Sequence, residues 1–298
     1  MTDCIRDRFV VVDEFMPADE SLAMRADIDA HFANPFYHAP QTHQVWNYWH
    51  VPGSYTYLRT SPEKVIELRK VEAFVAALRN WTATKLGLGR VTWPFLSMYV
   101  PGCLQGLHND SNNGRLGYVF SLTRDDRRTV GGETVIMQDR DLFRASLDKA
   151  AAGTDLFDLV APQFNRLTLF DDRVPHAVQR IEGPMDPVEG RFVLHGHISE
   201  SGPVTDGPIA PAKIQAEVER ALADIRDSVS PSVKGSLVVR IEVAATGDVV
   251  RAQPIFDRLV SAEGENLDML RDAILERIAA ARFEGEATST SANIPLIF

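Results

Sequence analysis

Short strand-like runs recur between residues 91 and 200, and this recurrence restricts the fold more than any other feature of the chain. The runs are rich in β-branched and aromatic residues, and segments rich in glycine, proline and asparagine separate them. Because no helical crossovers alternate with the runs, we expect an antiparallel sandwich or barrel, interrupted by a helical insert near 139–152. The runs are 92–100, 116–123, 133–137, 166–170, 176–181 and 191–198.

The first ninety residues combine a strand with helical stretches. Residues 9–12 read as the opening strand. A helix is expected over 61–87, where Ser61 can cap the first turn and apolar residues recur every three or four positions. The segment 36–59 is rich in aromatic residues and histidines without helical periodicity, and part of it is a candidate wall of a substrate pocket.

A Gly- and Pro-containing linker near 199–211 precedes a compact final unit. Its pattern is helix, two strands around a Thr-Gly-Asp turn, an amphipathic helix and a closing strand. The expected fold class is therefore an all-β core with flanking helices, followed by a small α+β domain. The expected domains are 1–203, with a helical part at 1–90 and the core at 91–200, and 204–298.

Composition excludes several classes of protein. Forty-one acidic residues against 31 basic residues give a formal net charge of −10, so nucleic acid is not an expected partner. The sequence has no run of about 18 apolar residues, so no membrane partner is expected either. Cys4 and Cys103 offer no disulfide framework, and the first residues lack the pattern of a signal peptide. The expected location is the cytoplasm.

Three residues form the most informative motif. His108 and Asp110 are two positions apart, so on an extended strand their side chains share a face and reach one metal ion. His176 lies on a later strand-like run. Two histidines and one carboxylate on one face of an octahedron leave open positions, which suits Fe(II) that binds a co-substrate and O2 together.

Arg191 adds a second requirement to this site. It lies 15 residues past His176 and opens the next predicted strand. A guanidinium there can bind the far carboxylate of a dicarboxylic acid through two parallel hydrogen bonds. A Tyr-Val-Pro-Gly turn at 99–102 precedes His108, and a Gly-Gly-Glu-Thr segment at 131–134 opens a strand between the metal-binding segments.

In this order, YVPG, HND, NGR, GGET, FNRLTLFDDRVPHAV and GRFVLHGHI resemble Fe(II)/2-oxoglutarate oxygenases of the prolyl-4-hydroxylase type, over roughly 90–200. The resemblance implies a double-stranded β-helix (jelly-roll) core and a hydroxylase that requires Fe(II), 2-oxoglutarate and O2. It implies that His108, Asp110 and His176 bind the iron and that Arg191 and Tyr99 bind 2-oxoglutarate. An aspartate in the triad favours hydroxylation over halogenation.

The resemblance also assigns further residues. Arg115 matches an arginine near the substrate opening, and Asn109 is a second candidate for substrate binding. The gap between His176 and Arg191 is longer than is usual, and Val193 stands where some relatives carry a hydroxyl residue. Ser121 or Thr134 is then expected to assist the arginine.

Strand alternation places Val193, His195 and His197 on the same face as Arg191. His195 is therefore a candidate catalytic residue, as a substrate contact or acid–base group, or else a histidine hydrogen-bonded within the barrel wall. A rival metal set of His195, His197 and Glu200 resembles part of a cupin site, but its carboxylate spacing is too short.

The final unit resembles the C-terminal domain of TonB-type energy transducers, which bind extended peptides at a sheet edge. The leading hypothesis is hydroxylation of an amino acid, peptide or small metabolite. A second hypothesis is an oxygenase that modifies a peptide or protein recruited by the final unit, which serves as a peptide-binding or homodimerisation module. An inactive jelly-roll scaffold is the third.

Overall fold

The computed structural model describes residues 4–33, 45–110, 113–138 and 156–298. They form two compact units, each described here by itself. The core unit comprises residues 8–77 and 92–197, and the C-terminal unit comprises 1–7, 78–91 and 198–298. The sequence division places 1–7, 78–91 and 198–203 in the first domain instead, and that division stays a prediction. The expected helical insert at 139–152 lies outside the described residues.

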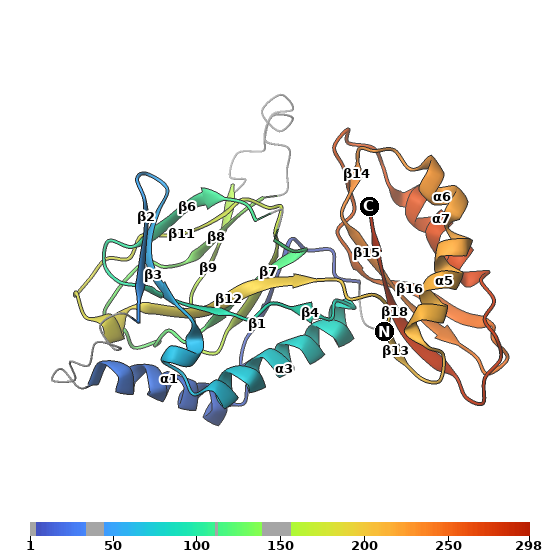
Figure 1. The fold of residues 1–298 in the computed structure, drawn as a ribbon. Coiled ribbons are helices and arrows are strands. Elements are labelled where there is room, and N and C mark those ends of the chain that lie inside the picture. The colour runs from blue at the N-terminus through green and yellow to red at the C-terminus, as the bar shows by residue number, and fades with distance from the viewer. Residues whose placement is uncertain (1–3, 34–44, 111–112, 139–155) are drawn as a thin grey trace. The chain divides into compact units, whose positions relative to one another are not determined.

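One large curled sheet forms the core unit (Figure 1). Its registered strand pairs are antiparallel, as the alternating, turn-separated runs predict, and the class is the jelly roll. Strand β2 (Asn47–Val51) pairs with β3, and β4 (Arg90–Val91) pairs with the end of β12. In order across the sheet the strands are β1 (Phe9–Val12), β10 (Leu167–Asp171), β7 (Leu116–Ser121), β12 (Arg191–Ser199), β5 (Phe95–Tyr99), β3 (Tyr55–Thr60), β6 (Leu104–His108), β11 (His176–Val178), β8 (Thr134–Met137) and β9 (Phe157–Val160).

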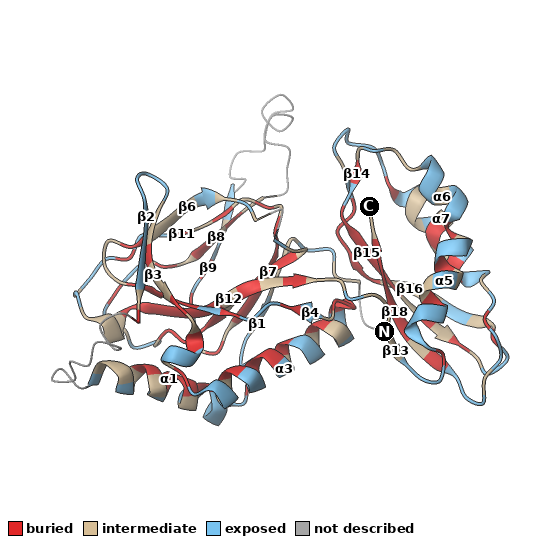
Figure 2. Cartoon of the chain, in the orientation of Figure 1, coloured by how far each residue is buried: buried red, intermediate tan, exposed pale blue. Residues whose placement is uncertain are grey.

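Helices α1 (Ala18–Ala33) and α3 (Leu68–Leu86) run along the outside of the sheet strands (Figure 1). The Phe74 ring of α3 stacks on the Phe120 ring of β7, with centroids 4.8 Å apart, so the apolar face of the helix covers the sheet. Figure 2 shows buried residues along β7 and β12.

The helix predicted from Ser61 begins later than expected. Residues Pro62–Lys64 form a separate 3-10 turn (η1), and the Ser61 side chain makes no capping hydrogen bond. Helix α3 starts at Leu68, directly after Asp27 Oδ2 accepts a hydrogen bond from Glu67 N at 3.0 Å. Leu68, one of the apolar residues in the predicted period, is 48% exposed, whereas Phe74 is fully buried.

In the C-terminal unit, three helices lie on one side of a four-stranded antiparallel sheet (Figure 1). Its core joins Ile214 and Ile274 of the helices to Val239 and Ile294 of the sheet. This is a small α+β fold, and its likeness to TonB stays a prediction. The elements are β13 (Val204–Asp206), α5 (Pro211–Ala221), α6 (Ala223–Ser228), β14 (Val233–Lys234), β15 (Ser236–Val243), β16 (Val249–Asp257), β17 (Val260–Ser261), α7 (Asp268–Ala279) and β18 (Thr290–Ile297).

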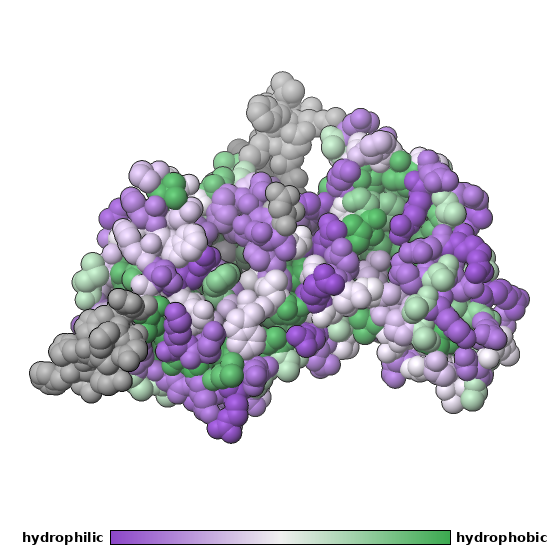
Figure 3. Space-filling model, in the orientation of Figure 1, coloured by the Kyte–Doolittle hydropathy of each residue, from purple (hydrophilic) through white to green (hydrophobic). Residues whose placement is uncertain are grey.

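Hydrophilic residues predominate on the face drawn in Figure 3 and separate the hydrophobic ones. Among the described helices, none combines the length and apolar character that crossing a membrane requires.

Candidate metal centre and its cavity

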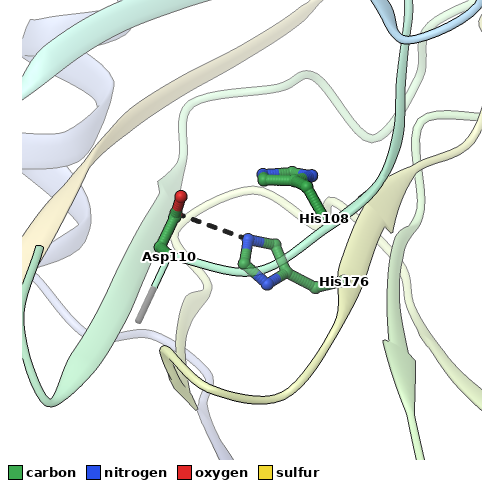
Figure 4. A group of neighbouring side chains, drawn as sticks. All are labelled: His108, Asp110 and His176. Atoms are coloured by element: carbon green, nitrogen blue, oxygen red, sulfur yellow. Dashed lines mark ion pairs between the residues drawn. The ribbon is translucent and has the colours of Figure 1, made fainter. Parts of the chain in front are cut away.

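Two neighbouring strands bring the predicted triad together. His108 is the last residue of β6, and its Cα is paired directly with that of His176, the first residue of β11. The two rings lie 4.4 Å apart between centroids. Asp110 follows β6, and its Oδ2 lies 3.6 Å from His176 Nε2 (Figure 4). One ligand atom from each of the three residues lies within 4.8 Å of the others, which is a spacing that one ion can bridge.

Backbone carbonyls determine which nitrogen of each histidine is free. His108 Nδ1 lies 2.8 Å from Gly106 O, and His176 Nδ1 lies 3.0 Å from Val174 O. Because a carbonyl oxygen only accepts hydrogen bonds, each Nδ1 carries the proton and donates it. Each Nε2 therefore presents a lone pair, the arrangement that holds a metal-binding histidine in one orientation.

The donor set fits a divalent cation. Burial lowers the pKa of His108, so its ring is neutral near pH 7, as a ligand must be. The Asp110 carboxylate lies 3.6 Å from His176 Nε2, a separation at which one cation can bind both atoms.

Gln105 is a contact that sequence reasoning missed. Its Nε2 donates a hydrogen bond of 3.0 Å to His108 Nε2, using the lone pair that a bound metal would take instead, and its Oε1 accepts a hydrogen bond of 3.1 Å from the Tyr99 hydroxyl. The amide thus links the predicted co-substrate tyrosine to the predicted metal ligand. Strand alternation puts residues three apart on opposite faces, so no local pattern signalled this contact, which forms where the pairing of β6 with β11 shifts register.

Arg191 is 1% exposed and has no anionic partner among the described residues within 4.0 Å. Its Nη2 donates a hydrogen bond of 3.2 Å to Thr134 Oγ1, its guanidinium lies 4.9 Å from the centre of the Tyr99 ring, and its Nε has no hydrogen-bond partner. A buried cation without a counter-charge is costly by several kcal/mol. The site therefore suits a ligand that carries its own carboxylate to this depth.

A cavity of about 310 Å³ connects these groups. The triad, Arg191, Tyr99 and Thr134 all line it. So do Val193, His195 and His197, as strand alternation predicts, while Phe192, Leu194 and Ile198 are buried on the other face of β12. The size is at the lower end for small-molecule sites.

His195 lies in the cavity wall, where its Nε2 is 2.8 Å from Ser97 Oγ. Burial, together with the charges of Arg59 and Arg191, lowers the pKa of His195 to about 3. The ring is therefore neutral near pH 7, which suits a hydrogen-bonding contact better than a proton-donating acid.

Three predicted residues lie apart from this group. Ser121 Oγ donates to Pro162 O at 3.0 Å, so its hydroxyl is already used elsewhere. Asn109 is exposed. Neither they nor Arg115 belong to the cavity lining among the described residues, and their proposed roles stay predictions.

Asp172 forms a second group that sequence reasoning missed. Its Oδ2 lies 3.1 Å from His197 Nδ1, and these two residues with Asp110 also bring three ligand atoms within 4.8 Å of one another. Burial alone would lower the pKa of His197, but the fully buried Asp172 outweighs it and raises the pKa. The rival set of His195, His197 and Glu200 does not assemble in the described part of the chain.

No protein-family model matches this chain, and no curated protein matches it. Solved structures with partly similar folds include a Pseudomonas putida prolyl-4-hydroxylase, which is 18% identical with a TM-score of 0.45 over 64% of this chain and 92% of that one. A Trichoplax adhaerens prolyl hydroxylase in complex with a hypoxia-inducible factor peptide is 14% identical, with a TM-score of 0.44 over 63% and 81%. The α-ketoglutarate-dependent epimerase SnoN of nogalamycin biosynthesis is 12% identical, with a TM-score of 0.47 over 66% and 79%.

Proposed function

We propose that this chain is an Fe(II)- and 2-oxoglutarate-dependent dioxygenase that hydroxylates an unactivated C–H bond of an amino acid, peptide or small metabolite. The observation that carries the proposal is the buried Arg191, which has no anionic partner among the described residues, in the same cavity as His108, Asp110 and His176. A metal triad alone suits many ions. A buried cation in the same cavity adds the requirement for a dicarboxylate that reaches both.

Fe(II) would be held by His108 Nε2, His176 Nε2 and the Asp110 carboxylate, and 2-oxoglutarate by the ion and by Arg191. Bound together, they supply oxidative chemistry in which O2 decarboxylates 2-oxoglutarate to succinate and CO2 and places one oxygen atom on the substrate. The chain orients these groups. Thr134 and the Tyr99 ring hold the guanidinium, and the two carbonyl contacts hold the imidazoles.

The cavity wall also limits water. Tyr57 and Tyr99 stack with ring centroids 5.2 Å apart, and both are largely buried. Burial raises the pKa of Tyr99 well above its usual range, so the phenol stays neutral and donates to Gln105. This neutral aromatic wall would limit the access of water to a metal bound by the triad.

The test is anaerobic addition of Fe(II) and 2-oxoglutarate to the protein, with the visible charge-transfer absorption of the complex as the readout. The wild type should develop the band, and His176→Ala should not. A wild type without a band, or an unchanged band in His176→Ala, contradicts the proposal. Substrate-stimulated release of succinate then screens amino acids, peptides and metabolites.

A further inference from the structure

We infer that Arg59 binds a carboxylate of the substrate, so the molecule oxidised is a carboxylic acid held at the mouth of the cavity. This rests on the proposed function for the meaning of "substrate", but the binding site itself is argued from the geometry of Arg59. Arg59 lies on β3, in register with Ser97 of β5, and lines the same cavity as the triad.

Two aromatic rings hold the Arg59 guanidinium. Its Cζ lies 3.8 Å from the centre of the Trp49 ring of β2 and 4.1 Å from that of the Phe95 ring of β5. Trp49 and Phe95 are 38% and 44% exposed, so the guanidinium and its two rings lie where the cavity meets solvent. Rings on the faces of a guanidinium leave its N–H edge free, and that edge matches the two oxygens of a carboxylate.

The charge of Arg59 has no counter-charge in the described structure. No carboxylate of a described residue lies within 4.0 Å, and no hydrogen bond of its guanidinium to a described residue is present. Arginines elsewhere in the unit do pair, as Arg25 does with Asp29 and Arg166 with Asp13. The chain has a formal net charge of −10, yet among the described residues the Arg59 guanidinium contacts only aromatic rings. Its charge is therefore available to an anionic ligand in the cavity.

With Fe(II) and 2-oxoglutarate bound, the positive charge of Arg59 would remain for the substrate to neutralise. The two positive charges of Fe(II) and the charge of Arg191 balance Asp110 and the doubly negative 2-oxoglutarate. His197 Nδ1 and Asp172 Oδ2 already lie within hydrogen-bond distance of each other, at 3.1 Å. Arg59 then remains as the cation among the described cavity residues, and a single carboxylate neutralises it.

Neighbouring groups suit the rest of such a molecule. The His195 ring lies 5.9 Å from the Phe95 ring between centroids, and the Arg59 guanidinium lies 4.1 Å from the same Phe95 ring. Tyr55 and Tyr57 continue the same wall toward the triad. The acid would thus enter with its carboxylate at the mouth and direct an apolar or weakly polar part toward the metal. Free amino acids and the C-terminal residue of a peptide both carry this chemistry.

The experiment measures binding without turnover. Metal-free protein is titrated with N-acetyl amino acids, each as the free acid and as the uncharged amide, while tryptophan fluorescence is followed because Trp49 contacts the guanidinium. At least one acid should bind about tenfold or more tightly than its amide. Arg59→Met should abolish that preference, Arg59→Lys should retain part of it, and the exposed, Glu182-paired Arg180 provides the matched control Arg180→Met.

Three results would overturn the inference. The first is that the wild type binds acids and amides equally, or binds neither. The second is an unchanged preference for acids in a folded Arg59→Met variant with native circular dichroism, and the third is loss of the preference in Arg180→Met. The visible band then separates this inference from the proposed function. Arg59→Met should keep the wild-type affinity for 2-oxoglutarate, and a loss of that affinity would make Arg59 a co-substrate ligand instead.

If the wild type forms no band, the oxygenase proposal fails while the acid preference remains testable. Extending the best acid into peptides that end in the same residue distinguishes a free acid from a peptide terminus.

Discussion

Arg191 and Thr134 meet across the cavity although their strands are not neighbours in the sheet. The hydrogen bond from Arg191 Nη2 to Thr134 Oγ1 measures 3.2 Å, while β5, β3, β6 and β11 intervene between β12 and β8 in the sheet order. The curl of the sheet closes this distance. The interaction therefore connects the Gly-Gly-Glu-Thr segment to the arginine that we assign to 2-oxoglutarate.

Thr134→Val tests this connection. Valine keeps the shape of threonine but leaves the buried Nη2 without its acceptor, so the affinity for 2-oxoglutarate should fall about tenfold. Titration of the visible band in the anaerobic Fe(II) protein measures it. Ser121→Ala provides the comparison, because Ser121 Oγ binds Pro162 O and its loss should cost about 1 kcal/mol of stability without changing the affinity. If Ser121→Ala lowers the affinity for 2-oxoglutarate and Thr134→Val does not, Ser121 is the hydroxyl residue that assists Arg191.

Gly132 supports Arg191 from the backbone side. Its φ is +82°, and a Cβ there would lie 2.5 Å from Ile181 Cδ1 and 3.0 Å from Arg191 Cδ. Gly132→Ala should therefore destabilise the fold by about 1–3 kcal/mol and weaken 2-oxoglutarate binding. Gly53→Ala has a similar φ of +73° with no atom within 4 Å, so it should cost about 1 kcal/mol and leave binding unchanged. Urea unfolding gives the free energy of unfolding of each variant. If Gly132→Ala and Gly53→Ala lose the same amount, the close contacts at Gly132 do not matter.

His195 should make stability depend on pH. Burial lowers its pKa to about 3 in the folded chain, so between that value and about 6.5 the unfolded chain binds the extra proton. The free energy of unfolding therefore falls as pH falls through this window, by at most about 1.4 kcal/mol per pH unit from this group. Urea unfolding near pH 7 and near pH 5 should show a steeper loss for the wild type than for His195→Gln. Parallel losses would mean that His195 titrates normally.

The two overlapping metal groups can be separated by substitution. If His108, Asp110 and His176 hold the ion, His108→Ala should reduce the affinity for Mn(II), a redox-stable substitute for Fe(II), by about 100-fold or more. His197→Ala should change it little, since His197 is already paired with Asp172. Electron paramagnetic resonance of free Mn(II) gives both affinities. A severe loss in His197→Ala with a mild one in His108→Ala would move the site to Asp110, Asp172 and His197.

Local patterns in the sequence located many of the core strands and, among the cavity residues, the triad, Tyr99 and Arg191, but not Gln105 or Arg59. The spacing of His108 and Asp110 predicted a shared strand face; in the structure β6 ends at His108, and Asp110, just past the strand, lies 3.6 Å from His176. Alternation along 191–198 likewise predicted that Arg191, Val193, His195 and His197 share a face, and all four line the cavity. The start of α3 was missed, because the contact between Glu67 and the distant Asp27 competes there with the local capping signal of Ser61.

Periodicity and spacing along the chain therefore determine which residues are strands and which side chains share a face, since both follow from backbone geometry within a few residues. They cannot tell Thr134 from Ser121 as the partner of Arg191, because that choice depends on how the sheet curls. Nor can they assemble Trp49, Arg59 and Phe95, which come from three different strands. Such pairings depend on strand order and closure of the whole sheet, and a side chain's partner follows from that closure because hydrogen bonds and ring contacts act over only a few ångströms.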